Sequence, residues 1–221
     1  MVAVLSLQLR TLSAAISLQL RISYSNHLFY FYKKTLLSTG GYKITDQGAM
    51  YFVSFAVVGW VDVFTRKDHR DVVIESLKYC QEKKGLIIYV WCIMSNHLHL
   101  IISAKENNVS DVLGDFKKFT SKQLMKSIIE HPGESRKEWM IEIFKKAGES
   151  NSRNTYHQFW QQDNQPKIIY TPHFAAQKLE YVHNNPVEAG IVEKAEEYIY
   201  SSARDYYHGK QCGLLKVEFL I

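Results

Sequence analysis

The alternation of apolar and polar residues from position 42 onward predicts three strands early in a folded domain. Residues 51–60 are mostly β-branched and aromatic and reach a glycine near their end, which is typical of a strand. Residues 86–93 form a continuous apolar run, as in a buried strand. After a short turn, residues 97–103 return as a further strand. The last two segments are therefore expected to form a hairpin.

One helix is predicted between the first two strands, and another is predicted after the third. Apolar residues recur every three or four positions over residues 68–83, and a second helix is expected from Ser110 to about Glu130, before Pro132. The order β-α-β-β-α is the front of a βαββαβ unit. We therefore predict an α+β, ferredoxin-like fold, in which helices cover one face of an antiparallel sheet.

The C-terminal third is expected to be a mainly helical extension of this fold. A short strand is predicted within residues 156–160 or 167–170. A helix is expected to begin near Pro172 and to end at residues 184–186 (Asn-Asn-Pro), because a proline disfavours the helical conformation in the residue before it.

The composition of the 221-residue chain is that of a globular protein. Hydrophobic residues make up 46% and charged residues 22%, which excludes disordered, collagen-like and coiled-coil classes. The three cysteines include no CxxC pair, which excludes a disulfide scaffold and a cysteine-type zinc site. This cysteine usage favours a reducing cytoplasm.

The formal net charge of +5 comes mainly from residues 1–40, which contain four basic and no acidic residues. The overall charge therefore gives no argument for nucleic-acid binding by the rest of the chain. The same segment repeats Ser-Leu-Gln-Leu-Arg at residues 6–10 and 17–21. Its arginines interrupt any secretory signal or membrane span, which leaves a transit peptide or, as the favoured interpretation, a wrongly extended start. We expect the domain at residues 41–210 and a tail at 211–221.

His97 and His99 are the first candidates for chemistry. Side chains alternate on a strand, so the two imidazoles share one face, about 6.6 Å apart along the chain. On that face they could bind one metal ion through nitrogen. An isolated His-x-His pair is more often two hydrogen-bonded histidines on a half-exposed strand, so this pattern needs support from elsewhere in the sequence.

The helix predicted over residues 110–130 offers that support. Its apolar stripe includes Phe119 and, four residues later on the same face, Gln123. A polar amide on an apolar stripe needs a partner, so the carbonyl oxygen of Gln123 is a candidate third metal ligand. Four lysines lie beside the stripe and form either a solvated helix face or a phosphate-binding face: Lys117, Lys118, Lys122 and Lys126.

Several segments in order resemble one known family. Residues 91–101 (WCIMSNHLHLI) resemble the HUH signature (histidine, hydrophobic, histidine) of the single-tyrosine transposases of small insertion sequences. Residues 115–123 (DFKKFTSKQ) resemble the catalytic helix of the branch called REP-associated tyrosine transposases, and residues 159–162 (FWQQ) and 181–190 (YVHNNPVEAG) resemble its C-terminal hallmarks. The likeness extends over residues 42–207.

The resemblance implies a ferredoxin-like bacterial cytoplasmic enzyme, usually a homodimer, that needs neither a membrane nor a nucleotide cofactor. Such enzymes bind single-stranded or hairpin DNA and cut and rejoin it in DNA transposition. Mg²⁺ or Mn²⁺, held by His97, His99 and Gln123, would polarise the scissile phosphate. A helix tyrosine would form a covalent 5′-phosphotyrosine. Trp160 would either belong to the core or stack on a DNA base.

The position expected for the tyrosine, four residues before the helix amide, is occupied by Phe119, which has no oxygen for attack. Either the helix register differs by a few residues, or Tyr181, Tyr156 or Tyr170 takes its place; Tyr181 lies in a hallmark to which we assign a structural role. Three functions stay open. They are a transposase with a weakened or relocated nucleophile, a non-catalytic descendant that binds hairpin DNA, and a phosphodiesterase that uses metal-activated water.

Overall fold

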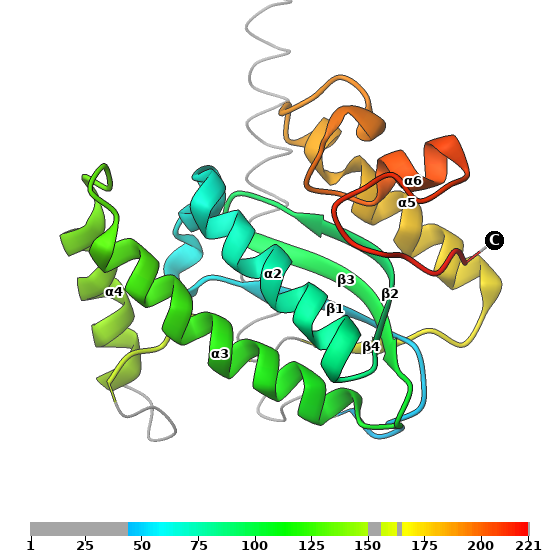
Figure 1. The fold of residues 1–221 in the computed structure, drawn as a ribbon, viewed down its shortest axis with the longest axis horizontal. Helices are drawn as coiled ribbons and strands as arrows, with labels where there is room; N and C mark the ends of the chain where they lie inside the picture. Colours follow the sequence, from blue (N-terminus) through cyan, green and yellow to red (C-terminus); the bar gives the residue numbers. More distant parts are fainter. Residues whose placement is uncertain (1–43, 150–155, 163–164, 221) are drawn as a thin grey trace, which may run out of the picture. The chain divides into compact units, whose positions relative to one another are not determined.

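The computed structural model describes residues 44–149, 156–162 and 165–220, so the expectations for residues 1–40 lie outside it. Its helices and strands, shown in Figure 1, are β1 (Tyr51–Ala56), η1 (Val58–Trp60), η2 (Val63–Thr65), α2 (Lys67–Lys83), β2 (Leu86–Ile93), β3 (His97–Ala104), α3 (Val109–Glu130), α4 (Lys137–Glu149), β4 (Lys167–Ile168), α5 (Pro172–Glu188), η3 (Ala195–Glu197) and α6 (Ala203–His208). Across this part of the chain, every helix is too short or too polar to cross a membrane.

The strands form one antiparallel sheet in the order β2-β3-β1-β4 (Figure 1). β2 and β3 are the predicted hairpin. β1 lies beside β3, with Ala56 opposite His97 and Ser54 opposite His99. A helix follows β1 and another follows β3, as in a βαββαβ unit. The predicted α+β, ferredoxin-like fold is confirmed.

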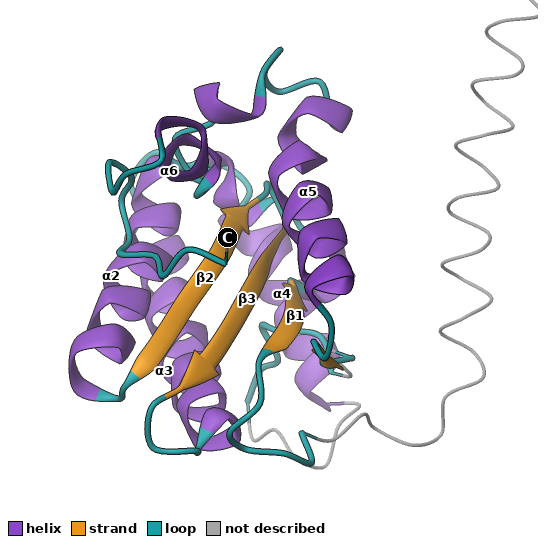
Figure 2. Cartoon of the chain, turned by 90° about the vertical axis from the view of Figure 1, so that its right-hand side faces the viewer, coloured by secondary structure: helices purple, strands orange, loops and turns teal. Residues whose placement is uncertain are grey.

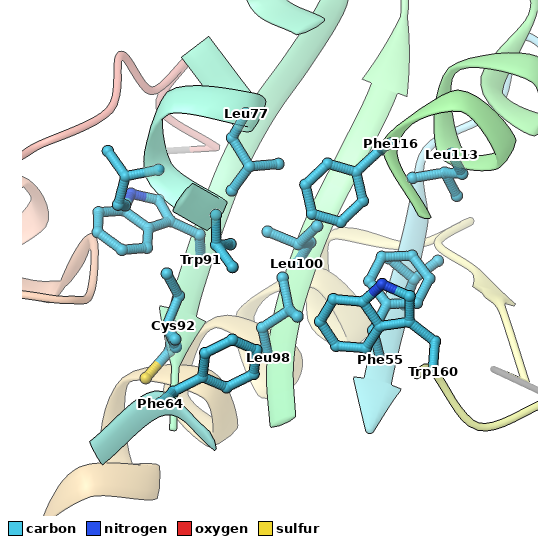
Figure 3. Close-up of a cluster of buried hydrophobic side chains, with 14 of the residues drawn as sticks. Phe55, Phe64, Leu77, Trp91, Cys92, Leu98, Leu100, Leu113, Phe116 and Trp160 are labelled. Atoms are coloured by element: carbon cyan, nitrogen blue, oxygen red, sulfur yellow. The ribbon is translucent and has the colours of Figure 1, made fainter. Parts of the chain in front are cut away.

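Helices α2 and α3 cover one face of the sheet, where the largest apolar side chains meet (Figures 1 and 3). Leu98 and Leu100 of β3 point into this cluster and are fully buried. The rings of Phe55 and Phe116 lie 5.9 Å apart in it, and Phe116 also stacks on Trp160. Because side chains alternate on β3, His97 and His99 must face the other side of the sheet.

Helix α5 covers that other side, where it packs on β2 and β3 (Figure 2). The C-terminal segment then returns to β2, where the Glu218 N–H donates to the carbonyl of Ile88 at 2.9 Å. Leu215 and Val217 are buried in the core. The helical extension therefore closes the second face of the sheet, and residues 211–220, expected as a tail, contribute to the packing.

The first strand is shorter than predicted. β1 ends at Ala56, and the expected strand residues up to Trp60 instead form a tight turn. Gly59 and Trp60 both have positive φ, 65° and 55°, which extended backbone does not allow. Aromatic and β-branched composition favoured a strand here, whereas the glycine in fact marks a turn.

The helix that begins at Pro172 is longer than predicted. α5 continues through Pro186 to Glu188, and the carbonyl of Asn185 accepts the N–H of Ala189 at 3.0 Å. A proline within the last turn removes only one backbone hydrogen bond, so the helix tolerates it there. Asn185 therefore stays on the helix.

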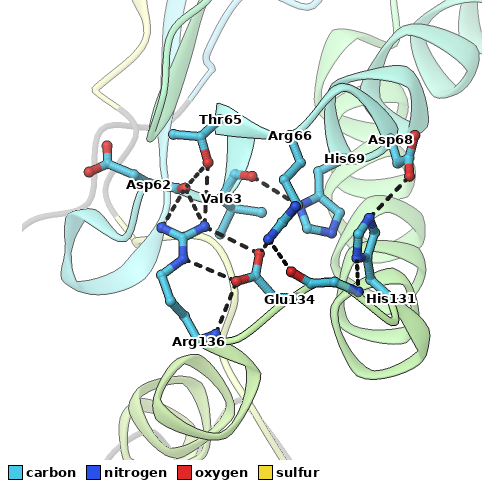
Figure 4. A network of polar contacts seen from close by, with 10 residues as sticks. Asp62, Val63, Thr65, Arg66, Asp68, His69, His131, Glu134 and Arg136 are labelled. Atoms are coloured by element: carbon cyan, nitrogen blue, oxygen red, sulfur yellow. Dashed lines mark hydrogen bonds and ion pairs between the residues drawn. The ribbon is translucent and has the colours of Figure 1, made fainter.

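A buried carboxylate joins the loop after α3 to the start of α2 (Figure 4). Glu134 is 2% exposed, and its oxygens accept hydrogen bonds from Arg66 at 2.7 Å and Arg136 at 3.1 Å. Burial alone would raise the pKa of Glu134, but the hydrogen bonds from Arg136 and Arg66 lower it to about 2. The nearby His131 pairs with Asp68 at 3.3 Å. This network fixes the α2–α3 layer on the face that the histidine pair does not use.

Candidate functional site

The histidine pair lies at the end of β3, on the face that α5 covers. The ring centroids of His97 and His99 are 4.7 Å apart, with the ring planes at 75°. His99 is buried and His97 is half-buried. The strand thus brings the two imidazoles closer than its backbone spacing alone requires.

Hydrogen bonds orient both imidazoles. The Nδ1 atom of His99 lies 2.6 Å from Ser54 Oγ, and its Nε2 atom is buried without a hydrogen-bond partner. Nδ1 of His97 lies 2.7 Å from Asn96 Oδ1. The Asn96 amide N–H donates to the carbonyl of Trp60 at 3.3 Å, which turns its oxygen toward His97. In both rings the hydrogen bond lies at Nδ1, which leaves Nε2 as the atom that can bind a metal.

Both histidines are neutral at neutral pH. Burial lowers the pKa of His97 to about 4, and a nearby Asp62 carboxylate opposes this only in part. Burial lowers the pKa of His99 well below its ordinary value, and the charges of His97 and Lys178 lower it further. Because a neutral imidazole is the form that ligates a metal, no proton has to be displaced first.

Helix α5 places a tyrosine against this pair. The ring of Tyr181 lies 5.2 Å from that of His99 and 6.0 Å from that of Phe52, both in edge-on contact. The tyrosine is 39% exposed, so a ligand can approach it. Burial raises the pKa of its phenol, and a hydrogen bond with the Asn185 side chain acts in the opposite direction. Asn185 lies one turn later on the same helix face.

The local sequence explains why α5 presents these residues. Thr171 caps the helix by accepting the N–H of Phe174 at 3.2 Å, and Pro172 occupies the first turn, where it is favoured. From that start, Lys178 and Tyr181 lie three residues apart and share the face toward the sheet.

Lys178 is a cation beside Tyr181, and its charge acts on His99. Its Nζ lies 5.0 Å from the ring centroid of Tyr181, 5.1 Å from that of Phe52 and 5.4 Å from that of Phe174. Burial lowers its pKa, and the charge of Lys167 adds to this effect. A half-buried ammonium over aromatic rings is well placed to attract a phosphate.

The residues present fit a divalent cation with a mixed nitrogen and oxygen ligand set. Within the described ranges, no group of three or more His, Cys, Asp or Glu side chains could hold a metal. His99 nevertheless presents an orphaned Nε2, and His97 lies beside it. Asn185 adds an amide oxygen on the neighbouring helix, of the kind that hard divalent ions accept.

Gln123, the expected third metal ligand, and Phe119, at the expected nucleophile position, lie away from the histidine pair. Gln123 and Phe119 lie on α3 and line a groove of about 1020 Å³ between α2 and α3. α3 packs on the Leu98 and Leu100 side of the sheet, so neither residue is on the side of His97. The structure thus does not bring Gln123 or Phe119 to the histidine pair, and their roles as metal ligand and nucleophile position stay predictions.

Trp160 is a core residue and not a surface for DNA. It is 5% exposed, its indole N–H donates to Thr120 Oγ1 at 3.0 Å, and its ring stacks on Phe64. With its polar atom satisfied and its faces covered, it has no surface left for a base. Of the two alternatives for Trp160, its position in the structure favours the core over base stacking.

The four lysines of α3 lie on the helix layer away from the histidines. Lys118 and Lys122 line the α2–α3 groove together with acidic side chains, whereas Lys117 donates to the carbonyl of Gln161 at 3.3 Å. Lys126 lies 3.9 Å from Glu130. The basic stripe is therefore partly neutralised, and its contact with DNA stays a prediction.

Tyr156 and Tyr170 are far more exposed than Tyr181, at 81% and 77%. Tyr170 follows β4, which pairs with β1 at Tyr51, the end of β1 opposite to the one beside His97. Tyr156 precedes His157, whose ring faces Ser121 of α3 at 3.4 Å. Tyr181 is thus the candidate tyrosine that the fold brings to the histidine pair.

Four residues of the site were not among the candidates from the sequence: Ser54, Trp60, Lys178 and Asn185. Ser54 could have been found from the strand register, because it faces His99 across β1 and β3. Lys178 lies three residues before Tyr181 within the predicted helix, so helical spacing could have found it, whereas Asn185 falls at the predicted helix end. Nothing in the sequence pattern marks Trp60 as a site residue.

Comparison with known proteins found one family and a solved structure that this chain resembles. The family described as "Transposase IS200 like" matches residues 60–158, which include both histidines. No curated protein matches the sequence. A solved structure described as a REP-associated tyrosine transposase bound to a REP hairpin has a similar fold, with a TM-score of 0.52 and 14% identity over 83% of this chain and 94% of that chain. Residues 60–158 of the chain are therefore similar to the IS200-like transposases, and the chain shares the fold of a REP-associated tyrosine transposase.

Proposed function

We propose that this protein cleaves and rejoins single-stranded DNA at hairpin-forming sequences, with Tyr181 as the nucleophile. The observation that supports this most strongly is the contact of Tyr181 with His99, 5.2 Å between ring centroids, on the face of the sheet that carries the histidine pair. The resemblance to single-tyrosine transposases implies a helix tyrosine as nucleophile, and Tyr181 of α5 is the candidate beside the histidines. Lys178 stands beside it to attract the phosphate.

The proposed step exchanges one phosphodiester for another. The Tyr181 phenol loses its proton to solvent, and its oxygen attacks phosphorus. The bond from phosphorus to the 3′-oxygen breaks, the 3′-oxygen takes up a proton, and a 5′-phosphotyrosine remains on the protein. Attack by a 3′-hydroxyl reverses the step and rejoins the strand, so no nucleotide cofactor is required.

Mg²⁺ or Mn²⁺ would be held by Nε2 of His97 and His99 and by the amide oxygen of Asn185, where it would act as a Lewis acid on the scissile phosphate. Ser54 and Asn96 keep the histidine rings in the ligating orientation. The Asn185 amide N–H also donates to the backbone carbonyl of Tyr181 at 2.5 Å, so the same side chain would connect the helix turn of the nucleophile with the ion.

The test is a covalent adduct on a pool of labelled hairpin oligonucleotides with randomised single-stranded flanks, in the presence of Mn²⁺. The wild type should give a protease-sensitive band that is retarded in a denaturing gel. Tyr181→Phe should give none, since it removes only the hydroxyl and keeps the ring against His99. Tyr170→Phe is the matched control, at an exposed tyrosine outside the site, and should react like the wild type.

The alternative, a non-catalytic descendant that binds hairpin DNA, follows from Phe119 at the nucleophile position, whereas our proposal places the nucleophile at Tyr181. Binding of the hairpin pool with no adduct from the wild type would nevertheless support it. Release of a cut strand without any adduct would instead support a phosphodiesterase with metal-activated water.

The partner we propose is single-stranded or hairpin DNA. The solved relative described above is bound to a REP hairpin, and this chain shares its fold. The homodimer stays a prediction, and the site does not require one, because the tyrosine and both histidines come from one chain.

A further inference from the structure

Trp60 presents a large exposed aromatic ring beside the histidine pair. Its side chain is 48% exposed, and its ring centroid lies 5.8 Å from that of His97, with the planes at 78°. The turn after β1 carries it to the end of the sheet at which His97 lies. An apolar surface therefore borders the site at which we place the scissile phosphate.

The backbone that presents this ring is strained. Trp60 has a φ of 55°, in a region that bulky residues rarely adopt. Gly59 before it has a φ of 65°, and a Cβ there would lie 3.2 Å from Cγ2 of Ile143. The fold thus holds a tryptophan in a conformation that disfavours it, which is an observation that points to function.

One side chain fixes Trp60 and His97 relative to each other. The Asn96 amide N–H donates to the Trp60 carbonyl at 3.3 Å, and the Asn96 amide oxygen accepts from His97 Nδ1 at 2.7 Å. The Trp60 N–H donates to the carbonyl of Val57 at 3.0 Å. The indole is therefore pre-positioned at a set distance from the predicted metal site.

Packing of the core does not explain the position of this ring. Trp91 and Trp160 are buried, at 0% and 5% exposure, and contribute their apolar area to folding. Trp60 leaves nearly half of its surface in water. A rigid, exposed ring beside a phosphate site is what stacking on a nucleobase requires.

We propose that Trp60 is the stacking platform for the nucleobase next to the scissile phosphate. This inference rests on the proposed function, because that function places the phosphate at His97 and His99. Every base has an aromatic face, so the platform accepts any base and adds no sequence preference of its own. Stacking would hold the phosphate in line with Tyr181, which makes Trp60 a positioning residue.

The test compares the affinity for an oligothymidylate of about fifteen nucleotides with that for an abasic strand of equal length. Both carry the same phosphates, so their affinity ratio isolates stacking. Trp60→Ala should lower this ratio about ten-fold, the factor that corresponds to ~1.4 kcal/mol. Trp60→Phe should retain most of it. Trp139→Ala, at an exposed tryptophan on α4, should leave it unchanged.

An unchanged ratio in Trp60→Ala would overturn the proposal. An equal loss of affinity for both strands would also overturn it, since the residue would then act only through His97 or the phosphates. Tyr181→Phe separates this inference from the proposed function: it should lose the adduct and keep the ratio. If the wild type forms no adduct but Trp60→Ala still lowers the affinity ratio, the proposed cleavage is refuted. Stacking of a base on Trp60 is then supported.

Discussion

Tyr181 and His99 of one chain lie with their ring centroids 5.2 Å apart. The proposed nucleophile and the proposed metal ligands thus come together within one chain, from α5 and β3. The proposed site therefore requires no residue from a second copy of the chain. This relationship determines how inactive variants should behave when they are mixed.

We expect that mixing His97→Ala with Tyr181→Phe restores no adduct. Each variant lacks one part of a site that is complete within a chain, so two halves cannot combine. The measurement is gel analysis of the mixture after co-expression, beside each variant alone and the wild type. Adduct formation in the mixture would show that the tyrosine acts on the histidines of a partner, and it would support an obligatory homodimer.

Ser54→Ala should weaken binding of Mn²⁺ by about 10–100-fold, the usual effect of removing a hydrogen bond behind a metal-bound histidine. Ser54 Oγ holds His99 at Nδ1 and lies outside the metal's reach. Calorimetric titration checks this, with Ser121→Ala on α3 as control. Equal affinity in Ser54→Ala would mean that His99 is oriented by packing alone or does not bind the ion.

Lys178→Met should flatten the salt dependence of binding to single-stranded DNA. Each lost phosphate contact lowers the slope of log affinity against log salt by roughly 0.7 on single strands. The double variant Lys118→Glu/Lys122→Glu should change the slope less, because these lysines share their groove with acidic side chains. A larger change of slope in the α3 double variant than in Lys178→Met would show that DNA contacts α3 and that its four lysines belong to the binding surface.

Glu134→Gln should destabilise the domain by about 3 kcal/mol, because it removes the charge that Arg66 and Arg136 pair with in a buried position. The pKa of this carboxyl is depressed to about 2 in the folded chain. Its contribution is therefore complete above its ordinary pKa, near 4.5, and is lost as the pH falls toward 2. Urea unfolding at several pH values measures both effects. The stability difference between wild type and variant should shrink on acidification, and a constant difference would contradict this account.

The hairpin and the histidine pair could be predicted from the sequence because their signals are local. Strand alternation puts His97 and His99 on one face wherever that strand lies. The helix that completes the site could not be predicted in this way. Phe119 with Gln123 and Tyr181 with Asn185 are both an aromatic residue followed four positions later by an amide, and helical periodicity does not say which face of a sheet a helix will cover.

The proline at 186 added to that ambiguity. It favoured a helix end at residues 184–186, whereas α5 in fact continues to Glu188 and keeps Asn185 on the helix, one turn after Tyr181. The turn that carries Trp60 was not predicted for a similar reason. Aromatic composition favoured a strand there, whereas Gly59 and Trp60, both with positive φ, form a turn. In both places, long-range packing outweighed the local preference.

The most direct measurement is to find the residue that carries the DNA. Wild-type protein is allowed to react with the hairpin pool and Mn²⁺, is digested with nuclease and protease, and its peptides are identified by mass spectrometry. The account predicts a nucleotide on the peptide that contains Tyr181, and none in that peptide from Tyr181→Phe or His97→Ala. A modified peptide that contains Tyr156 or Tyr170, or an adduct that persists in Tyr181→Phe, would contradict it.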